Sequence, residues 1–305
     1  MSTDITTSLD WTRQLQSLEE TVPGEVDEDG TWKNIGIATR FTKRIGKEHE
    51  EIGLLGKEDI HDDTDLFNDN SFALTWLLFD TRFLRYCTEL RGGTGTIGKT
   101  NSLMQSMLVG GVQKHRLIRG ALCERVTIDV AKLPRVTANF KCLSQSNWMD
   151  DAALEAEIGD LYVPAPAVTS KAWTHKTAGT LTPFTYGGSA RDLRMMSIDV
   201  NRNPAIKDPL GHPDPKSIRA GGRRISNNVT MWLEDNTLMT DTQTWGAGKT
   251  LVIRLQAATP VDLTLTGFKP NDYTQDNDVN SFDPLTEPLT GTCETVTVSP
   301  LTVAG

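Results

Sequence analysis

LRMMSIDVNRNPAIKDPLG (193–211), KSIRAGGRRISNNVTMWLED (216–235) and TWGAGKTLVIRL (244–255) form the stretch, Leu193–Leu255, that decides the fold of this chain. Apolar and polar residues alternate in each part, as Met196, Ile198 and Val200 illustrate. A period of two places alternate side chains on opposite faces of a strand. The stretch therefore predicts an antiparallel β unit with one face in a core and a polar second face.

The sequence before this stretch predicts an arm and an earlier β half. Residues 1–30 are polar, with an apolar helical spacing at Trp11, Leu15 and Leu18, and we expect an arm with a short amphipathic helix. Residues 31–143 form the first β half. Within it we expect an Asp-rich loop over 53–70 and, from apolar spacings of three and four, a helix over 71–90.

The rest of the chain predicts a connector and a second β half. Residues 144–186 read as an irregular connector with one short helix, which Asp150 or Asp151 caps and Gly159 ends. Residues 187–305 form the second β half, with a loop over 270–286 and a C-terminal strand over 290–299.

The two halves resemble each other loosely. Each contains an alternating strand, then glycine, then a pair of strands joined by a turn, with Gly120 in the first half and Gly221 and Gly222 in the second. We interpret this as a possible degenerate duplication. The fold class we predict is mainly β: antiparallel sheets in a β-sandwich or open barrel with a flanking helix.

The composition bounds the function. The chain has 305 residues, a net charge of −9 and a pI of about 5.1, which argues against a dedicated nucleic-acid-binding surface. The cysteines form no CxxC pair and the histidines are scattered, so we expect reduced core cysteines and no metal site. The N-terminus lacks the apolar segment of a secretory signal, and no apolar run is long enough to span a bilayer.

One formal motif carries possible chemistry. The segment from Gly93 through Gly98 and Lys99 to Thr100 fits the phosphate-binding pattern GxxxxGK[ST]. A functional loop of this kind follows a buried parallel strand, whereas the preceding residues look helical and the following strands look antiparallel. A Gly/Thr-rich loop explains the match better, and nucleotide binding at these residues is kept as an alternative.

The remaining charged clusters have the pattern of solvated loops. The aspartates do not follow the spacing of a calcium-binding loop, and the arginines would pair with an acidic neighbour or a phosphate. The clusters are Asp59, Asp62, Asp63 and Asp65; Asp272, Asp276 and Asp278; and Arg219, Arg223 and Arg224. No catalytic constellation can be argued from the sequence, so we predict no enzyme, no cofactor and no catalytic residue.

The second half resembles the major tail tube proteins of long-tailed (siphovirus-like) viruses of bacteria and archaea. The resemblance lies in TPFTYGGSARDLRMMSIDVNRNP (182–204), IRAGGRRISNNVTMWLEDNT (218–237) and WGAGKTLVIRL (245–255). In the first half, LIRGALCERVTIDVAKLPRVTANFKC (117–142) is similar to the glycine-containing strand pair of the same family. The irregular connector departs from the family pattern.

This resemblance implies a structural virion protein. In this family, subunits form hexameric or pseudo-hexameric trimeric rings around a closed inner β-barrel, and the rings stack into the viral tail tube. The tape measure protein and the DNA pass through the lumen without sequence-specific binding during ejection into the host. Assembly takes place in the host cytoplasm, and no membrane partner is expected. The acidic net charge favours a channel that repels phosphate. A monomeric β-sandwich binding module remains the second alternative.

Overall fold

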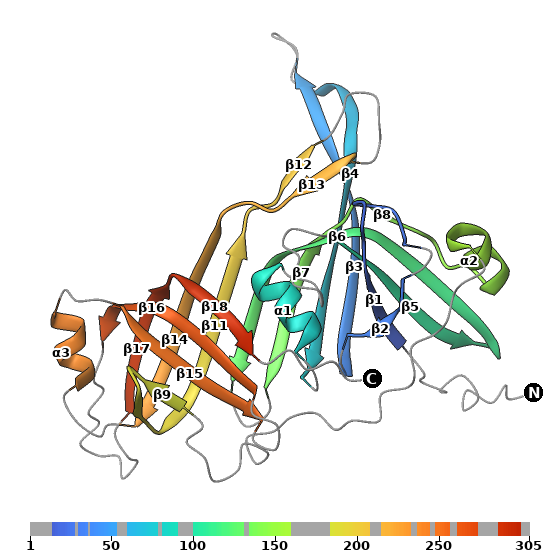
Figure 1. Cartoon of the computed structure of the whole chain (residues 1–305). Helices are drawn as coiled ribbons and strands as arrows, with labels where there is room; N and C mark the ends of the chain where they lie inside the picture. The colour runs from blue at the N-terminus through green and yellow to red at the C-terminus, as the bar shows by residue number, and fades with distance from the viewer. Residues whose placement is uncertain are drawn as a thin grey trace, which may run out of the picture.

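The computed structural model describes residues 14–27, 30–35, 37–53, 60–78, 81–90, 100–130, 134–159, 184–207, 215–232, 237–244, 248–256, 261–273 and 286–299. Over these ranges the protein is mainly β, with long antiparallel strands and three short helices (Figure 1). The predicted fold class is confirmed at this level.

The elements follow one another along the chain as strands interrupted by single helices. The strands of the first half are β1 (Gln14–Glu19), β2 (Lys33–Asn34), β3 (Ile37–Gly53), β4 (Ile60–Leu77), β5 (Asn101–Val109), β6 (Val112–Val130), β7 (Arg135–Lys141) and β8 (Ser144–Gln145). Those of the second half are β9 (Phe184–Tyr186), β10 (Ser189–Ala190), β11 (Leu193–Arg202), β12 (Ala205–Lys207), β13 (Ser217–Arg219), β14 (Arg223–Trp232), β15 (Lys249–Gln256), β16 (Val261–Tyr273), β17 (Thr286–Cys293) and β18 (Thr295–Ser299). The helices are α1 (Arg82–Glu89), α2 (Asp151–Ile158) and α3 (Thr237–Gln243).

A central antiparallel sheet runs through the whole molecule. Its strand order is β3-β4-β7-β6-β11-β14-β17-β16, so the two halves of the chain lie side by side in one sheet (Figure 1). The alternation in the sequence buries one face of this sheet, for example at Leu74, Val126, Ile198 and Val229. The opposite face carries polar side chains.

Two strands leave the central sheet and build the layer that covers its apolar face. β6 bends at Gly120 (φ +65°) and β16 bends at Gly267 (φ +66°), a backbone conformation that favours glycine. Before its bend, β6 pairs with β5 and β8, and β16 pairs with β15 and β18. Buried side chains of both layers form one core cluster.

The two halves repeat the same pairing scheme. β1, β3, β4, α1, β5, β6, β7 and β8 correspond in order and in partners to β9, β11, β14, α3, β15, β16, β17 and β18. Register shifts recur at matching places: Ala38/Arg40 with Leu193/Met195, Asn101/Leu103 with Lys249/Leu251, and Cys123/Arg125 with Pro270/Asp272. The duplication is therefore present, but Gly120 matches Gly267 and not Gly221 or Gly222.

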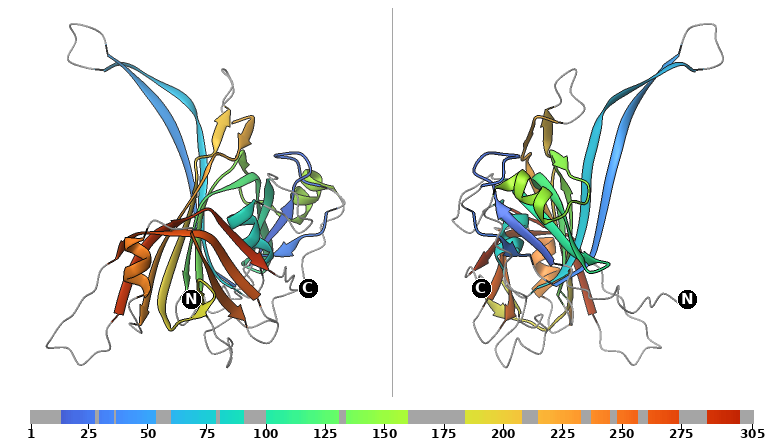
Figure 2. Two further views of the ribbon diagram at one scale, coloured as in Figure 1. Left: turned by 60° about the vertical axis from the view of Figure 1, so that its left-hand side comes forward. Right: turned by 90° about the vertical axis from the view of Figure 1, so that its right-hand side faces the viewer.

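The predicted loop 53–70 and helix 71–90 were wrong over most of their length. Residues 60–77 form β4, which pairs with β3 in a long hairpin that projects from the body (Figure 2), and only Arg82–Glu89 is helical. Phe72, Leu74 and Trp76 are buried while the residues between them are half-buried, which is a period of two. Leu77 also fits a helical spacing, and this misled the prediction.

Other boundaries changed less. The predicted arm 1–30 contains strand β1, which buries Leu15 and Leu18, so residues 14–19 are not helical. The predicted loop 270–286 loses its first residues to β16, and the C-terminal strand is two strands, β17 and β18. The helix after Asp150 is confirmed: the Asp150 carboxylate accepts from the Ala153 amide at 3.0 Å. The remainder of the connector, residues 160–183, lies outside the described ranges.

Candidate assembly interface

The two repeated units join where β6 pairs with β11. The register runs antiparallel from Val130 opposite Met196 to Arg125 opposite Asn201. On the apolar side, Val126 lies opposite Val200 and Ile128 opposite Ile198, and all four side chains are fully buried. Cross-strand pairs of β-branched residues stabilise such a seam. The junction therefore continues the central sheet without a break between the units.

Ionic contacts cross the polar side of the same junction. Arg125 Nε donates to Asp199 Oδ1 at 2.7 Å, and this hydrogen bond raises the pKa of Arg125. The Ser197 hydroxyl donates to Asp129 Oδ1 at 2.8 Å. The Ser197–Asp129 contact joins residues directly opposite each other, and the Arg125–Asp199 contact joins residues on a diagonal. Both contacts therefore favour one register of β6 and β11.

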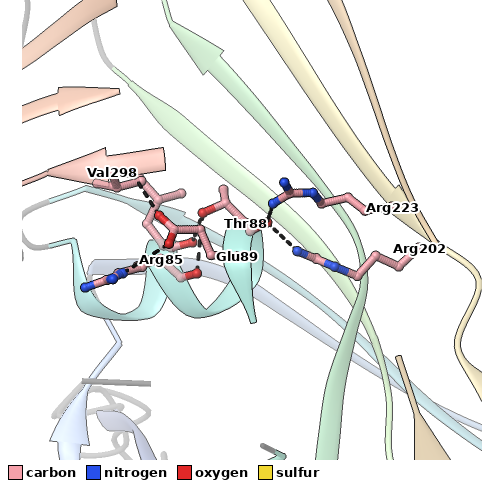
Figure 3. A network of polar contacts seen from close by, with 7 residues as sticks. Arg85, Thr88, Glu89, Arg202, Arg223 and Val298 are labelled. Atoms are coloured by element: carbon pink, nitrogen blue, oxygen red, sulfur yellow. Dashed lines mark hydrogen bonds and ion pairs between the residues drawn. The ribbon is translucent and has the colours of Figure 1, made fainter. Parts of the chain in front are cut away.

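Helix α1 fastens the second unit to the first (Figure 3). The Arg202 guanidinium, buried under the sheet, donates to the carbonyls of Cys87 and Thr88 in the last turn of α1. Arg223 donates to the same Thr88 carbonyl at 3.1 Å. Carbonyls in the last helical turn lack partners within the helix, and the helix dipole favours a cation there. Arg202 and Arg223 therefore cap a helix that belongs to the other unit.

A second contact of α1 reaches the C-terminal strand. The Glu89 carboxylate accepts from the Val298 amide of β18 at 2.9 Å and from Arg85 Nε at 3.3 Å (Figure 3). The helix thus holds strands β11, β14 and β18 of the second unit. Together with the β6–β11 pairing, this makes one continuous structure from two similar units.

The Arg202→Met variant is expected to lower the free energy of unfolding by about 2–3 kcal/mol, because two helix-terminal carbonyls lose a charged donor in a buried place. Chemical denaturation of the unassembled protein measures this change. Arg223→Met is the matched control, since Arg223 is exposed, and it should cost less than about 1 kcal/mol. Equal losses for the two variants would contradict the capping role of Arg202.

The two ends of the central sheet are edges formed by β3 and by the C-terminal part of β16. Within the described ranges, β3 pairs only with β4, and residues 269–273 of β16 pair only with β17. In the repeat, β3 corresponds to β11 and β16 to β6, which are the two strands of the internal junction. The edge strand β3 is thus equivalent to β11, one strand of the internal junction, and the edge strand β16 is equivalent to β6, the other strand.

The described side chains on the polar face of the central sheet do not share the acidic charge of the whole chain. Among the side chains that the structure describes on this face, which do not include those of residues 45–53 and 60–69 in the β3–β4 hairpin, basic ones outnumber acidic ones. The basic residues are Arg40, Arg44, Arg125, Arg135, Lys141, Arg224 and Lys269, and the acidic residues are Asp129, Asp199 and Asp272. The net charge of −9 therefore does not predict the sign of the charge on this face.

The phosphate-binding alternative receives little support from its surroundings. Gly93, Gly98 and Lys99 lie outside the described residues, whereas Thr100 is buried and its hydroxyl donates to the Glu20 carboxylate. Strand β5 begins directly after Thr100. In a phosphate-binding loop of this type, a helix would begin at this position. The Thr100 hydroxyl is thus engaged inside the protein, at the start of an antiparallel strand.

The structure assembles a Ser-His-Asp arrangement that the sequence did not reveal. Ser106 Oγ lies 2.8 Å from His115 Nδ1, and His115 Nε2 lies 2.6 Å from Asp151 Oδ1. Ser106 and His115 are fully buried, and the ring nitrogens are exchanged relative to a hydrolase triad, in which Nε2 faces the serine. The arrangement anchors α2 to β5 and β6 and leaves no accessible nucleophile.

The remaining predicted clusters do not converge in the part of the chain that the structure describes. No group of three His, Cys, Asp or Glu side chains there could hold a metal ion, and no helix there could span a membrane. Arg223 faces α1, Arg224 lies on the polar face of the central sheet, and Arg219 is exposed on β13. The four cysteines form no disulfide. Asp59, Asp276 and Asp278 fall outside the described ranges.

No family model matches this chain, and no curated protein matches it. The resemblance to tail tube proteins stays a prediction from the sequence.

Proposed function

We propose that this protein is a structural subunit that assembles with copies of itself into closed rings, and that the rings stack into the tail tube of a long-tailed virus. The single observation that carries the proposal is the match between the internal junction and the two free edges. One edge of the central sheet is equivalent to β11 and the other edge to β6, and these two strands pair with each other inside the chain. The edge of one copy can therefore pair with the opposite edge of the next copy, and the sheet continues from chain to chain.

Closure follows from the physics of sheet edges. An exposed edge strand presents unpaired backbone groups and recruits further strands, and a barrel removes such edges altogether. The apolar face of the central sheet is covered by the second layer, so its polar face would line the channel. The side chains of this wall that the structure describes include more arginine and lysine than aspartate, which does not support the expectation of an acidic channel.

The β3–β4 hairpin suits the contact between rings. It projects well beyond the body of the molecule, and the shorter β12–β13 hairpin extends the matching strands of the second unit on the same side (Figures 1 and 2). A projecting hairpin of this kind reaches past its own ring and can contact the next one. The tape measure protein and the DNA would pass through the channel, and the assembled protein would reside in the virion tail.

Electron microscopy of the purified protein, with mass photometry across salt concentrations, tests the proposal. We expect rings or tubes with a central channel on the order of tens of ångströms wide. A monodisperse monomer under every condition would contradict self-assembly and would favour the monomeric binding module. Lys99→Ala is the control for the nucleotide-binding alternative: we expect unchanged assembly and no ATP or GTP binding by either protein.

A further inference from the structure

We propose that β16 of one copy pairs with β3 of the next copy in the register of the internal junction, so that Asp272 of one chain binds Arg44 of the other. The inference rests on the proposed function and names the residues that would join the subunits. It follows from the repeat, from the charges at equivalent positions and from the accessibility of both edges.

The first step is the position equivalent to Asp199. On β11, Asp199 lies opposite Ser226 of β14, and Ser226 lies opposite Thr292 of β17. In the first unit, Arg44 of β3 lies opposite Ser71 of β4, and Ser71 lies opposite Lys141 of β7. The matching register shifts at Ala38/Arg40 and Leu193/Met195 support this alignment. Arg44 therefore takes the place of Asp199.

The second step is the position equivalent to Arg125. Arg125 of β6 is the first residue paired with β7 after the register shift, and it lies opposite Asn139. Asp272 of β16 is likewise the first residue paired with β17 after the shift, and it lies opposite Thr290. Both strands bend at a glycine with positive φ five residues earlier, Gly120 or Gly267. Asp272 therefore takes the place of Arg125.

The two differences between equivalent positions together exchange the charges of the ion pair: each edge residue carries the charge opposite to that of its equivalent at the internal junction. The internal junction has an arginine on β6 and an aspartate on β11, at 2.7 Å. The free edges carry an aspartate on β16 and an arginine on β3 at the equivalent positions. If only one of the two positions differed from the internal junction, two like charges would face each other across the strands. Because both positions differ, an aspartate still faces an arginine and the attraction is kept. The two free edges are thus complementary to each other.

The same exchange separates the two kinds of junction. If β3 of another copy replaced β11 beside β6, Arg44 would face Arg125, and if β16 replaced β6 beside β11, Asp272 would face Asp199. Like charges at these positions repel. The charge pattern therefore keeps the internal junction within the chain and directs β3 towards β16.

The edges have further features of a junction that awaits a partner. The side chains of Arg44 and Asp272 are exposed, and neither has an ion-pair partner among the residues that the structure describes. On the apolar side, the internal junction has Val200 opposite Val126, and in the proposed register the equivalent residues of the two edges are Ile45 and Tyr273.

A charge-exchange experiment tests the pairing. Arg44→Asp and Asp272→Arg should each raise the protein concentration at half-assembly about tenfold or more at low salt, because attraction becomes repulsion at every contact. The double variant should assemble like the unchanged protein. Arg40→Asp is the matched control, since Arg40 is exposed on the same face of β3 but corresponds to Met195, outside the paired stretch of β11. It should assemble normally.

Mixing the two single variants extends the test. Copies of the same variant repel each other. The aspartate that Arg44→Asp places on β3 attracts the arginine that Asp272→Arg places on β16, and these two residues meet only where a chain of one variant pairs with a chain of the other. A contact between the native Arg44 of the Asp272→Arg variant and the native Asp272 of the Arg44→Asp variant is attractive as well. The two variants must therefore alternate around a ring.

Alternation makes the outcome depend on the number of chains. Rings with an even number of chains, such as six, should form from an equimolar mixture. Rings of three chains cannot alternate and should stay open or fail to form. The outcome distinguishes hexameric from trimeric rings.

A disulfide cross-link tests the register independently of charge. Gly46 and Asp272 should lie directly opposite each other, at a Cα separation of about 5 Å, which suits a disulfide. The double variant Gly46→Cys, Asp272→Cys should give covalent oligomers under oxidation, up to the number of chains in the ring. The native thiols interfere little, because three are buried and burial raises the pKa of Cys293 to about 12.

The outcomes separate this inference from the proposed function. Rings that form normally from both single charge variants, with no cross-link, would overturn the pairing and leave the tube function standing. An unchanged protein that never assembles overturns both. Loss of assembly in the single variants, recovery in the double variant and a cross-link confirm the pairing. Circular dichroism verifies that each variant is folded.

Discussion

The Glu20→Ala variant is expected to lose about 3–5 kcal/mol of unfolding free energy, the largest effect we predict for a polar residue. Glu20 is 1% exposed and lies just after β1. Its side chain accepts four hydrogen bonds, each from a buried or half-buried donor. The donors are the Thr100 hydroxyl, the Ser102 hydroxyl at 2.6 Å, the Gly24 amide at 2.8 Å and the Gly120 amide at 2.7 Å.

The physical reason is the loss of a charged acceptor at a buried site. Alanine would leave all four donors unpaired, and each unpaired buried donor is costly. The donors also come from distant segments: the turn after β1, the start of β5 and the bend of β6. Glu20 therefore holds together three parts of the first unit, and its loss should loosen the bend at Gly120 as well.

Denaturant unfolding of the unassembled protein measures the effect. Glu20→Gln keeps one acceptor oxygen and should cost less than Glu20→Ala. Glu25→Ala removes an exposed carboxylate from the same segment and should change stability by less than about 0.5 kcal/mol. If Glu20→Ala and Glu25→Ala were equally mild, the carboxylate would not be the centre of this network.

The Gly120→Ala variant is expected to lose about 2–4 kcal/mol, from two causes that add. A residue with a Cβ resists φ +65°, which costs about 1–2 kcal/mol. The new Cβ would also lie 2.4 Å from Cγ of Leu143, a side chain in the core, and overpacking costs about 1–3 kcal/mol. Thermal unfolding of the unassembled protein, with denaturant titration, measures the sum.

Two other glycines separate these causes. Gly188 has φ +87° but open space around its Cβ position, so Gly188→Ala should show the backbone cost alone. At Gly267 the new Cβ would meet the side chain of Glu294, which is exposed and can move, so the loss should be intermediate. Adding Leu143→Ala to Gly120→Ala should cost less than the two single losses together. Strict additivity would contradict the predicted steric contact.

Local patterns alone determined much of the β structure. The alternation at Met196, Ile198 and Val200 predicted β11, and similar patterns predicted β14 and β15. Helix α2 was also predictable, because its capping Asp150 directly precedes it and its terminating Gly159 directly follows it in the sequence. Side-chain period and helix caps are properties of a few consecutive residues, so they can be recognised without knowledge of the fold.

Tertiary structure decided between patterns that the sequence left open. Residues 71–77 fit both a helix and a strand, and pairing with β3 and β7 on either side made them a strand. Leu15 and Leu18 likewise fit a helix, but β1 pairs with β5, which is far away along the chain. Backbone hydrogen bonds to distant strands decide such cases, because they satisfy donors and acceptors that the local sequence cannot assign.

The candidate interface depended on tertiary structure entirely. The sequence itself carried the charges of Arg44, Arg125, Asp199 and Asp272, and it suggested a duplication, but it aligned the wrong glycines. Only the strand register, with its recurring shifts, shows that Arg44 is equivalent to Asp199 and Asp272 to Arg125. The sequence by itself determined which faces are apolar. The pairing of strands far apart in the chain decided which charges meet, because a shift of one residue moves every side chain to the opposite face.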